Sequence, residues 1–242
     1  MNTKEKLEKL KNLNTLVESL SSGKEEVEQG VFLGKNVVRE PNIFFDTKPG
    51  KIIIGDNVII RAGSVLRGPL LIGDNCKIGG EIEYSIFENY SNKQHYGYVG
   101  HSYIGAWVNI GGGTSIATLK NTYSTIKLEG EDTGEQFLGA IIEDGVKTSV
   151  NSSIFCGKVI GAHSHIYGTV TEDVPPFTSH VSTGNLFELP IEIAIKVAKA
   201  MMARRNKDFT DQDEKQMRDL FQNTQDKRIK LGVKKDKLNF SA

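Results

Sequence analysis

The stretch IGDNVIIRAGSVLRGPLLIGDNCKIG, residues 54–79, carries an aliphatic residue at every sixth position. A helix with about 3.6 residues per turn would scatter such positions around its surface. Alternation along a single strand would put them on one face, but it would not explain why a glycine directly follows three of them. The step recurs further along the chain, at Ile54, Ile60, Leu66, Ile72 and Ile78, then at Ile104, Ile110 and Ile116, and then at Ile142, Thr148, Ile154, Ile160 and Ile166.

A six-residue step with glycines at one phase predicts a solenoid of hexapeptide repeats. Each repeat would form one short strand and one tight corner, three repeats would close a coil, and stacked coils would bury the aliphatic columns. Glycine and small polar residues suit the corners, where a Cβ would clash or a positive φ is required. The sequence therefore predicts an all-β core, a parallel β-helix, over residues 30–182.

Segments with a helical period flank this core. Residues 1–29 carry a leucine and valine stripe between charged residues, which predicts an N-terminal helical segment that packs on the core or on a neighbouring subunit. Residues 183–242 are expected to form a C-terminal helical segment and a basic tail, with Pro190 near the start of one helix and Thr210 as the N-cap of another. The six-residue step is lost at 120–138, which we interpret as a loop or hairpin that leaves the coil, either as a wall of a substrate site or as a tolerated insertion.

Composition limits the partners of the protein. Lys+Arg and Asp+Glu are balanced at 30 each, so no net charge attracts nucleic acid or a membrane. Cys76 and Cys156 lie far apart and outside any C-x-x-C pattern, which argues against a disulfide framework or a thiolate metal site and fits a reducing compartment. The N-terminus is charged, and no apolar run approaches the ~20 residues of a membrane helix. We expect a cytoplasmic protein that binds neither nucleic acid nor membrane.

The segment NKQHYGYVGHSYIGAWVNIGGGTSIATLK, residues 92–120, concentrates polar and aromatic side chains within the repeats. The side chains near its histidine His95 are Lys93, Tyr96, Tyr98, His101 and, about one coil further on, Asn109. Histidine titrates near neutral pH, and a histidine among convergent polar groups is suited to general base catalysis. A polar residue at a solenoid corner can equally be structural, so the residues alone leave both interpretations open.

This segment also resembles a known family. SNKQHYGYVGHSYIGAWVNIGGGT is similar to the pattern K-x-x-H-x-x-Y-x-G-D-x-x-I-G-x-x-x-N-x-G-x-G-T in the acetyltransferase half of the bifunctional N-acetylglucosamine-1-phosphate uridyltransferase/glucosamine-1-phosphate acetyltransferases. SIFENYSN and TLKN resemble elements of the archaeal and Bacteroidetes-like branches. The resemblance covers about residues 30–182 of this hexapeptide-repeat acyltransferase family, without the uridyltransferase domain. It implies a left-handed β-helix and a homotrimer that binds ligands in the grooves between subunits.

The resemblance implies a coenzyme A-dependent acyltransferase. Acetyl-CoA would be the co-substrate, the acceptor would be an amino sugar phosphate or a related sugar nucleotide, and no metal would be required. His95 would be the general base that deprotonates the attacking amine. The residues implied to bind the sugar substrate are Arg67, Lys93, Tyr98 and Asn109. The residues implied to line the coenzyme site are Gly112, Gly113 and Gly168, and backbone N–H groups of the glycine run 111–113 would face the developing oxyanion.

Three positions depart from the family pattern. Glu83 replaces a lysine, Thr118 an asparagine and His101 an aspartate, and a carboxylate at Glu83 would repel a phosphate. The acceptor is therefore left open. Two other classes of function also fit the fold: a catalytically inactive trimeric assembly or regulatory module, and a gamma-type zinc carbonic anhydrase to which His163 and His165 would contribute ligands.

Overall fold

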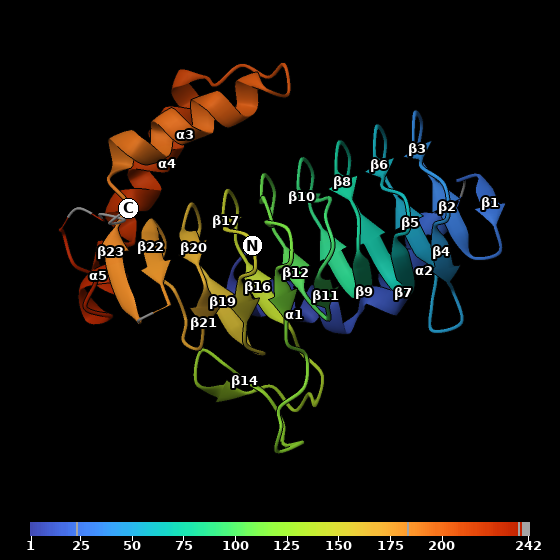
Figure 1. The fold of residues 1–242 in the computed structure, drawn as a ribbon, viewed down its shortest axis with the longest axis horizontal. Helices are drawn as coiled ribbons and strands as arrows, with labels where there is room; N and C mark the ends of the chain where they lie inside the picture. Colours follow the sequence, from blue (N-terminus) through green and yellow to red (C-terminus); the bar gives the residue numbers. More distant parts are fainter. Residues whose placement is uncertain (23, 183, 237, 239–242) are drawn as a thin grey trace.

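The computed structural model describes residues 1–22, 24–182, 184–236 and 238. Parallel coils stack along the long axis of the molecule, with the N-terminal helices behind the stack and the C-terminal helices at its end (Figure 1). Within these described ranges, we find no helix of the length and apolar character that a membrane crossing requires.

Short strands form three faces of the stack, and β1 (Glu26–Glu28) precedes them as an antiparallel partner of the first coil. The first face contains β2 (Val31–Leu33), β5 (Ile52–Ile54), the second halves of β7 (Val65–Ile72) and β9 (Glu81–Phe87), β12 (Tyr103–Ile104), β16 (Ala140–Ile142) and β19 (Lys158–Ile160). The second face contains β3 (Val38–Arg39), β6 (Ile59–Ile60), β8 (Lys77–Ile78), β10 (Asn92–Lys93), β17 (Lys147–Thr148), β20 (His165–Tyr167), β22 (Thr178–Val181) and β23 (Asn185–Glu188). The third face contains β4 (Phe44–Asp46), the first halves of β7 and β9, β11 (Tyr98–Gly100), β13 (Ser115–Ile116), β18 (Ser153–Ile154) and β21 (Thr169–Val170).

The inward side chains of successive coils lie in register. Ile54 pairs with Ile72 on the first face and Ile60 with Ile78 on the second, both in parallel strands. All of the aliphatic positions of the six-residue step are buried in one continuous cluster. Because each column removes apolar surface from water along the whole stack, the repeat itself supplies the core. The predicted fold class, a left-handed parallel β-helix with helices at both ends, is confirmed.

One inward position carries a cation instead of an aliphatic residue. Lys93 is in register with Ile78 and is 1% exposed. Its Nζ donates hydrogen bonds to the carbonyl oxygens of Gly79, at 3.0 Å, and His95. Burial lowers the pKa of Lys93 to about 8. This side chain is part of the core of the coil.

The N-terminal helices cover the first face. The sequence predicted one helical segment here, and the structure divides it into α1 (Thr3–Lys11) and α2 (Leu13–Ser21). Leu13 and Val17 are fully buried against the outward side chains of the first face. An ion pair joins Lys6 to Glu143 at 3.1 Å.

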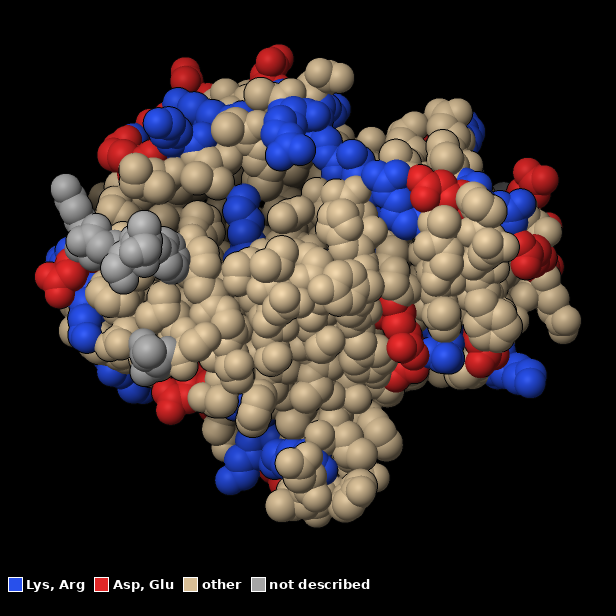
Figure 2. Space-filling view, in the orientation of Figure 1, with Lys and Arg blue, Asp and Glu red and all other residues tan. Residues whose placement is uncertain are grey.

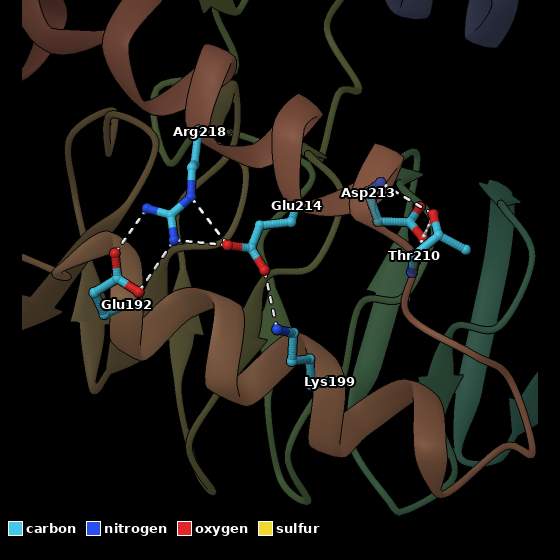
Figure 3. A network of polar contacts seen from close by, with 6 residues as sticks. All are labelled: Glu192, Lys199, Thr210, Asp213, Glu214 and Arg218. Atoms are coloured by element: carbon cyan, nitrogen blue, oxygen red, sulfur yellow. Dashed lines mark hydrogen bonds and ion pairs between the residues drawn. The ribbon is translucent and has the colours of Figure 1, made fainter.

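The C-terminal segment forms α3 (Ile191–Ala203), α4 (Asp211–Asn223) and α5 (Gln225–Lys230). Pro190 is the N-cap residue of α3, and the Thr210 side chain accepts a hydrogen bond from the backbone of Asp213, as the sequence predicted for a cap. Arg218 of α4 pairs with Glu192 of α3 and with Glu214, which also pairs with Lys199 of α3 (Figure 3). Ion pairs on the solvent-exposed side therefore link α3 to α4.

The predicted insertion is a hairpin of β14 (Lys127–Leu128) and β15 (Glu131–Asp132) that projects from the stack (Figure 1). Its Ile126 and Leu128 are buried in the cluster that contains α1 and α2. Lys11 Nζ donates to the carbonyl oxygen of Thr133 at 2.8 Å. The hairpin thus packs on the helices that cover the first face.

Candidate active site

His95 lies at the corner where the chain passes from the second face to the third. Its side chain is exposed and packs beside Gly112 of the next coil, where an added Cβ would lie 3.3 Å from the Cβ of His95. The His95 imidazole has no hydrogen-bond partner among the described residues. It is therefore free to accept a proton from a bound molecule.

Glycines make the surface beside His95 flat. Gly113 has a φ of 75°, which a side chain would strain, and a Cβ there would lie 3.0 Å from the hydroxyl of Tyr96. The Tyr96 hydroxyl donates to Asn151 Oδ1 at 3.1 Å, so the tyrosine ring spans the glycine. Asn151 occupies the corner position of Gly113 one coil further on. In the sequence, this relation is seen only when residues 120–138 are left out of the count. We did not identify Asn151 from the sequence.

Only one of the three consecutive glycines has an unused backbone donor in the described structure. The N–H of Gly111 donates to Thr148 Oγ1 and that of Gly113 to the carbonyl oxygen of Tyr96, both at 2.9 Å. The N–H of Gly112 has no acceptor among the described residues. Gly112 lies beside the His95 side chain, so a residue with an unused donor and a residue with an unpaired imidazole are neighbours.

The predicted coenzyme glycines follow this same corner. Gly168, which joins β20 to β21, has a φ of 90°, and a Cβ there would overlap the hydroxyl of Ser182. Its carbonyl oxygen accepts a hydrogen bond from the Ser153 N–H at 3.2 Å. Gly112, Gly113 and Gly168 therefore lie along one edge of the stack.

The third face beside the corner carries a chain of polar contacts. Arg67 forms an ion pair with Glu81, and this contact raises the pKa of Arg67. The Tyr98 hydroxyl donates a hydrogen bond to Glu83, and burial together with this contact raises the pKa of Tyr98. Figure 2 shows acidic side chains gathered over β7 and β9, where these residues lie. Arg67 and Tyr98 share the third face, but each is already bound to a carboxylate.

The two other predicted sugar-binding residues lie elsewhere. Asn109 is exposed on the second face, where it bridges β10 and β17. Lys93 points inward, and among the described residues its Nζ donates hydrogen bonds only to main-chain oxygens, so in this chain it supports the backbone of the His95 corner. The structure thus brings Arg67 and Tyr98 to one side of the His95 corner and Asn109 to the other.

His101 lies at a different corner, between the third face and the first. Its ring stacks on Tyr84 at 4.7 Å and on Phe137 at 5.6 Å. Its Nε2 is 4.0 Å from Glu83, and burial lowers the pKa of His101 against the opposing effect of that carboxylate. This histidine is a packed side chain rather than a neighbour of His95.

The pair His163 and His165 is covered by the C-terminal helices. His163 stacks on Phe177 at 5.1 Å, and both histidines line the narrow space beneath Val197 of α3. Burial lowers the pKa of each to about 4. Among the described residues, no three His, Cys, Asp or Glu side chains are grouped so that they could hold a metal within one chain.

Parts of the chain are similar to known proteins. Residues 51–81 match the family model described as bacterial transferase hexapeptide (six repeats). A bifunctional sugar-1-phosphate nucleotidylyltransferase/acetyltransferase of Sulfurisphaera tokodaii is 32% identical over an alignment of 151 residues that covers 52% of this chain and 38% of that protein. A bifunctional protein GlmU of a Synechococcus strain is 34% identical over 130 residues, 52% of this chain and 26% of its own length. The predicted resemblance to these bifunctional proteins is confirmed, although the chain spans less than two fifths of either.

A solved structure adds a more distant likeness. A variant of AntD, an N-acyltransferase from Bacillus cereus in complex with dTDP-4-amino-4,6-dideoxyglucose and coenzyme A, is 20% identical to this chain. The match covers 69% of this chain and 90% of that one, with a TM-score of 0.41. At a TM-score below 0.5, it has no bearing on the chemistry of the His95 corner.

Proposed function

We propose that the protein is a coenzyme A-dependent acyltransferase that transfers acetyl from acetyl-CoA to the amine of an amino sugar or sugar nucleotide. The observation that carries this proposal is the unpaired imidazole of His95 beside the unused N–H of Gly112. The name of the Sulfurisphaera tokodaii relative includes acetyltransferase activity, which supports the same class of reaction.

The reaction needs one base and one oxyanion donor. His95 removes a proton from the acceptor amine as its nitrogen attacks the thioester carbonyl carbon. The carbonyl oxygen becomes negatively charged and accepts a hydrogen bond from the Gly112 N–H. The C–S bond then breaks, the amide forms, and the thiolate of coenzyme A leaves and takes up a proton. A thioester is already activated, so none of these steps requires a metal.

The charges on the third face narrow the class of acceptor. Glu81 neutralises Arg67, and Glu83 presents a second carboxylate that holds Tyr98. A phosphate placed against this face would meet repulsion, whereas a sugar hydroxyl or ammonium group would find hydrogen-bond acceptors. We therefore propose that the part of the acceptor that contacts the third face is not phosphorylated.

A second subunit would complete the site. His95 and Tyr96 are both exposed at a convex corner, and Tyr96 is 69% exposed. A convex edge encloses no ligand by itself, and a groove arises when the edge of one stack lies against a face of another. The homotrimer expected from the resemblance would provide such grooves.

Thioester turnover tests the proposal directly. The full-length protein is incubated with acetyl-CoA and a panel of amino sugars, amino sugar phosphates and amino sugar nucleotides, with and without a chelator, and free thiol is measured. We expect acceptor-dependent thiol release at the same rate in both conditions. Absence of release with every acceptor would favour the inactive assembly module, and CO2 hydration that a chelator abolishes would favour the anhydrase.

A further inference from the structure

A cationic cavity of about 360 Å³ lies between α3 and the second face. Two of its cations come from β8 and β17 of the solenoid, and two follow the end of α3. These four side chains are Lys77, Lys147, Arg204 and Arg205. Amides from Asn92 and Asn109 also line the cavity, and no Asp or Glu among the described residues does. Figure 2 shows Lys and Arg gathered where the end of α3 meets the coils.

None of the four cations forms an ion pair with a described residue. Lys147 Nζ donates to the carbonyl oxygen of Gly145 at 2.7 Å, and Arg205 donates to Asn92 Oδ1 at 2.5 Å. By contrast, Lys199 of α3 and Arg218 of α4 form ion pairs with carboxylates (Figure 3). In a protein whose charges balance overall, this cavity is a local excess of positive charge.

Both lysines of the cavity are disfavoured as cations. Burial, followed by the charges of Arg205, Arg61 and Arg204, lowers the pKa of Lys77. Burial lowers the pKa of Lys147 to about 8. Charges that are partly withdrawn from water without a counter-ion are unfavourable, and an anion in the cavity would remove this cost.

We propose that this cavity binds the phosphate groups of a small molecule, as a diphosphate or a phosphomonoester. Guanidinium groups suit phosphate oxygens because they donate two parallel hydrogen bonds, and an ammonium group adds a point charge. Among the described residues, the side chains of Arg204 and Arg205 donate no hydrogen bond to the last carbonyl groups of α3, which accept the backbone N–H groups of Arg204, Arg205 and Asn206.

The location suggests how such a ligand would lie. Gln94, the neighbour of His95 in the chain, lines the same cavity. A ligand anchored here by phosphate could therefore extend over the corner to His95, with the acidic third face on the far side. The phosphate could belong to coenzyme A or to a phosphorylated acceptor. Binding of phosphate itself does not depend on the proposed acyl transfer, because it is measured without turnover.

Calorimetry on the full-length protein tests the site with defined probes. Pyrophosphate, coenzyme A, dephospho-coenzyme A and glucosamine-1-phosphate are titrated at low and high salt. We expect pyrophosphate to bind and its affinity to fall as salt rises, because the contact is electrostatic. No binding of any of these probes at millimolar concentration would overturn the proposal.

Variants that each remove one positive charge test whether the side chains of this cavity, rather than other cationic side chains, bind pyrophosphate. Lys147→Met and Arg205→Gln should each weaken pyrophosphate binding at least about tenfold, as expected for a lost charged hydrogen bond. Lys199→Met is the matched control, because it removes a positive charge from α3 outside the cavity, and it should stay within about twofold of wild type. Circular dichroism and melting temperature show that each variant is folded. Equal pyrophosphate affinity in all three variants and wild type would overturn the assignment.

The same titrations identify the source of the phosphate. If coenzyme A binds more tightly than dephospho-coenzyme A and Arg205→Gln abolishes that difference, the cavity holds the coenzyme. If glucosamine-1-phosphate binds and is weakened by Arg205→Gln while the two coenzymes are unaffected, it holds the acceptor. Either result supports the phosphate site, even if no thioester turnover is found with any acceptor.

Discussion

His95 and His101 are close in the chain, yet their surroundings are opposite. His95 is exposed and unpaired among the described residues, whereas His101 is stacked between Tyr84 and Phe137. A side chain without a hydrogen-bond partner in the protein is available to bind a ligand, whereas a side chain that stacks between two rings contributes to stability. These two histidines therefore form a matched pair for mutation.

His95→Ala should lower thioester turnover by roughly 10²–10⁴-fold, the contribution of a general base. Its melting temperature should stay close to that of wild type, because no described contact of the imidazole is lost. His101→Ala should show the reverse: a lower melting temperature, corresponding to about 1–2 kcal/mol for the lost stacking, with turnover largely kept. Full turnover in His95→Ala would refute the catalytic assignment.

Glu83 should set the preference between acceptors. Glu83→Lys removes the carboxylate that faces Tyr98 and places a cation on the third face. We expect the ratio of kcat/KM for glucosamine-1-phosphate to that for glucosamine to rise about tenfold or more, because one repulsion is replaced by one attraction. Glu83→Gln, which only removes the charge, should give an intermediate ratio. An unchanged ratio in both variants would show that the acceptor does not contact this face.

At the scale of single strands and helices, substitution of Lys93 measures how much a lysine buried in the coil contributes to stability. It occupies a position in an aliphatic column, and its Nζ donates hydrogen bonds to main-chain carbonyl oxygens. Burial lowers its pKa to about 8. Lys93→Met should leave stability unchanged or raise it, because a buried charge is exchanged for an apolar side chain of similar shape. Chemical denaturation measures this. A loss of several kcal/mol would mean that the hydrogen bonds to Gly79 and His95 outweigh the cost of burying the charge.

The α1–α2 segment should contribute strongly to stability through a few side chains. Leu13→Ala removes a fully buried side chain from the cluster on the first face and should cost about 2–5 kcal/mol in urea denaturation. Leu20→Ala is the control, because Leu20 is 38% exposed and lies outside that cluster. A similar, small effect of both substitutions would show that α2 is only loosely held on the coils.

For the whole molecule, the proposed site at the exposed His95 corner predicts an association of subunits. We expect a homotrimer in light scattering or sedimentation at micromolar concentration, with each groove formed by two chains. The charges of the two faces beside the corner are opposite, acidic around Glu83 and cationic around Lys147, so such a groove would present different electrostatic surfaces to two substrates. A stable monomer with full turnover would contradict the shared site.

The sequence by itself determined the coil, the burial of its aliphatic columns and the caps at Pro190 and Thr210, because these depend on residues within a few positions of each other. It also singled out His95 as a candidate general base, through the resemblance of residues 91–114 to a family pattern, and that role stays a prediction. Only the tertiary structure decided that Lys93 points inward, that Gly112 keeps an unused N–H, and that Lys147 faces Arg205 across a cavity. Those relations depend on register between coils and on where α3 lies against them, and no spacing along the chain encodes the approach of residues so far apart in sequence.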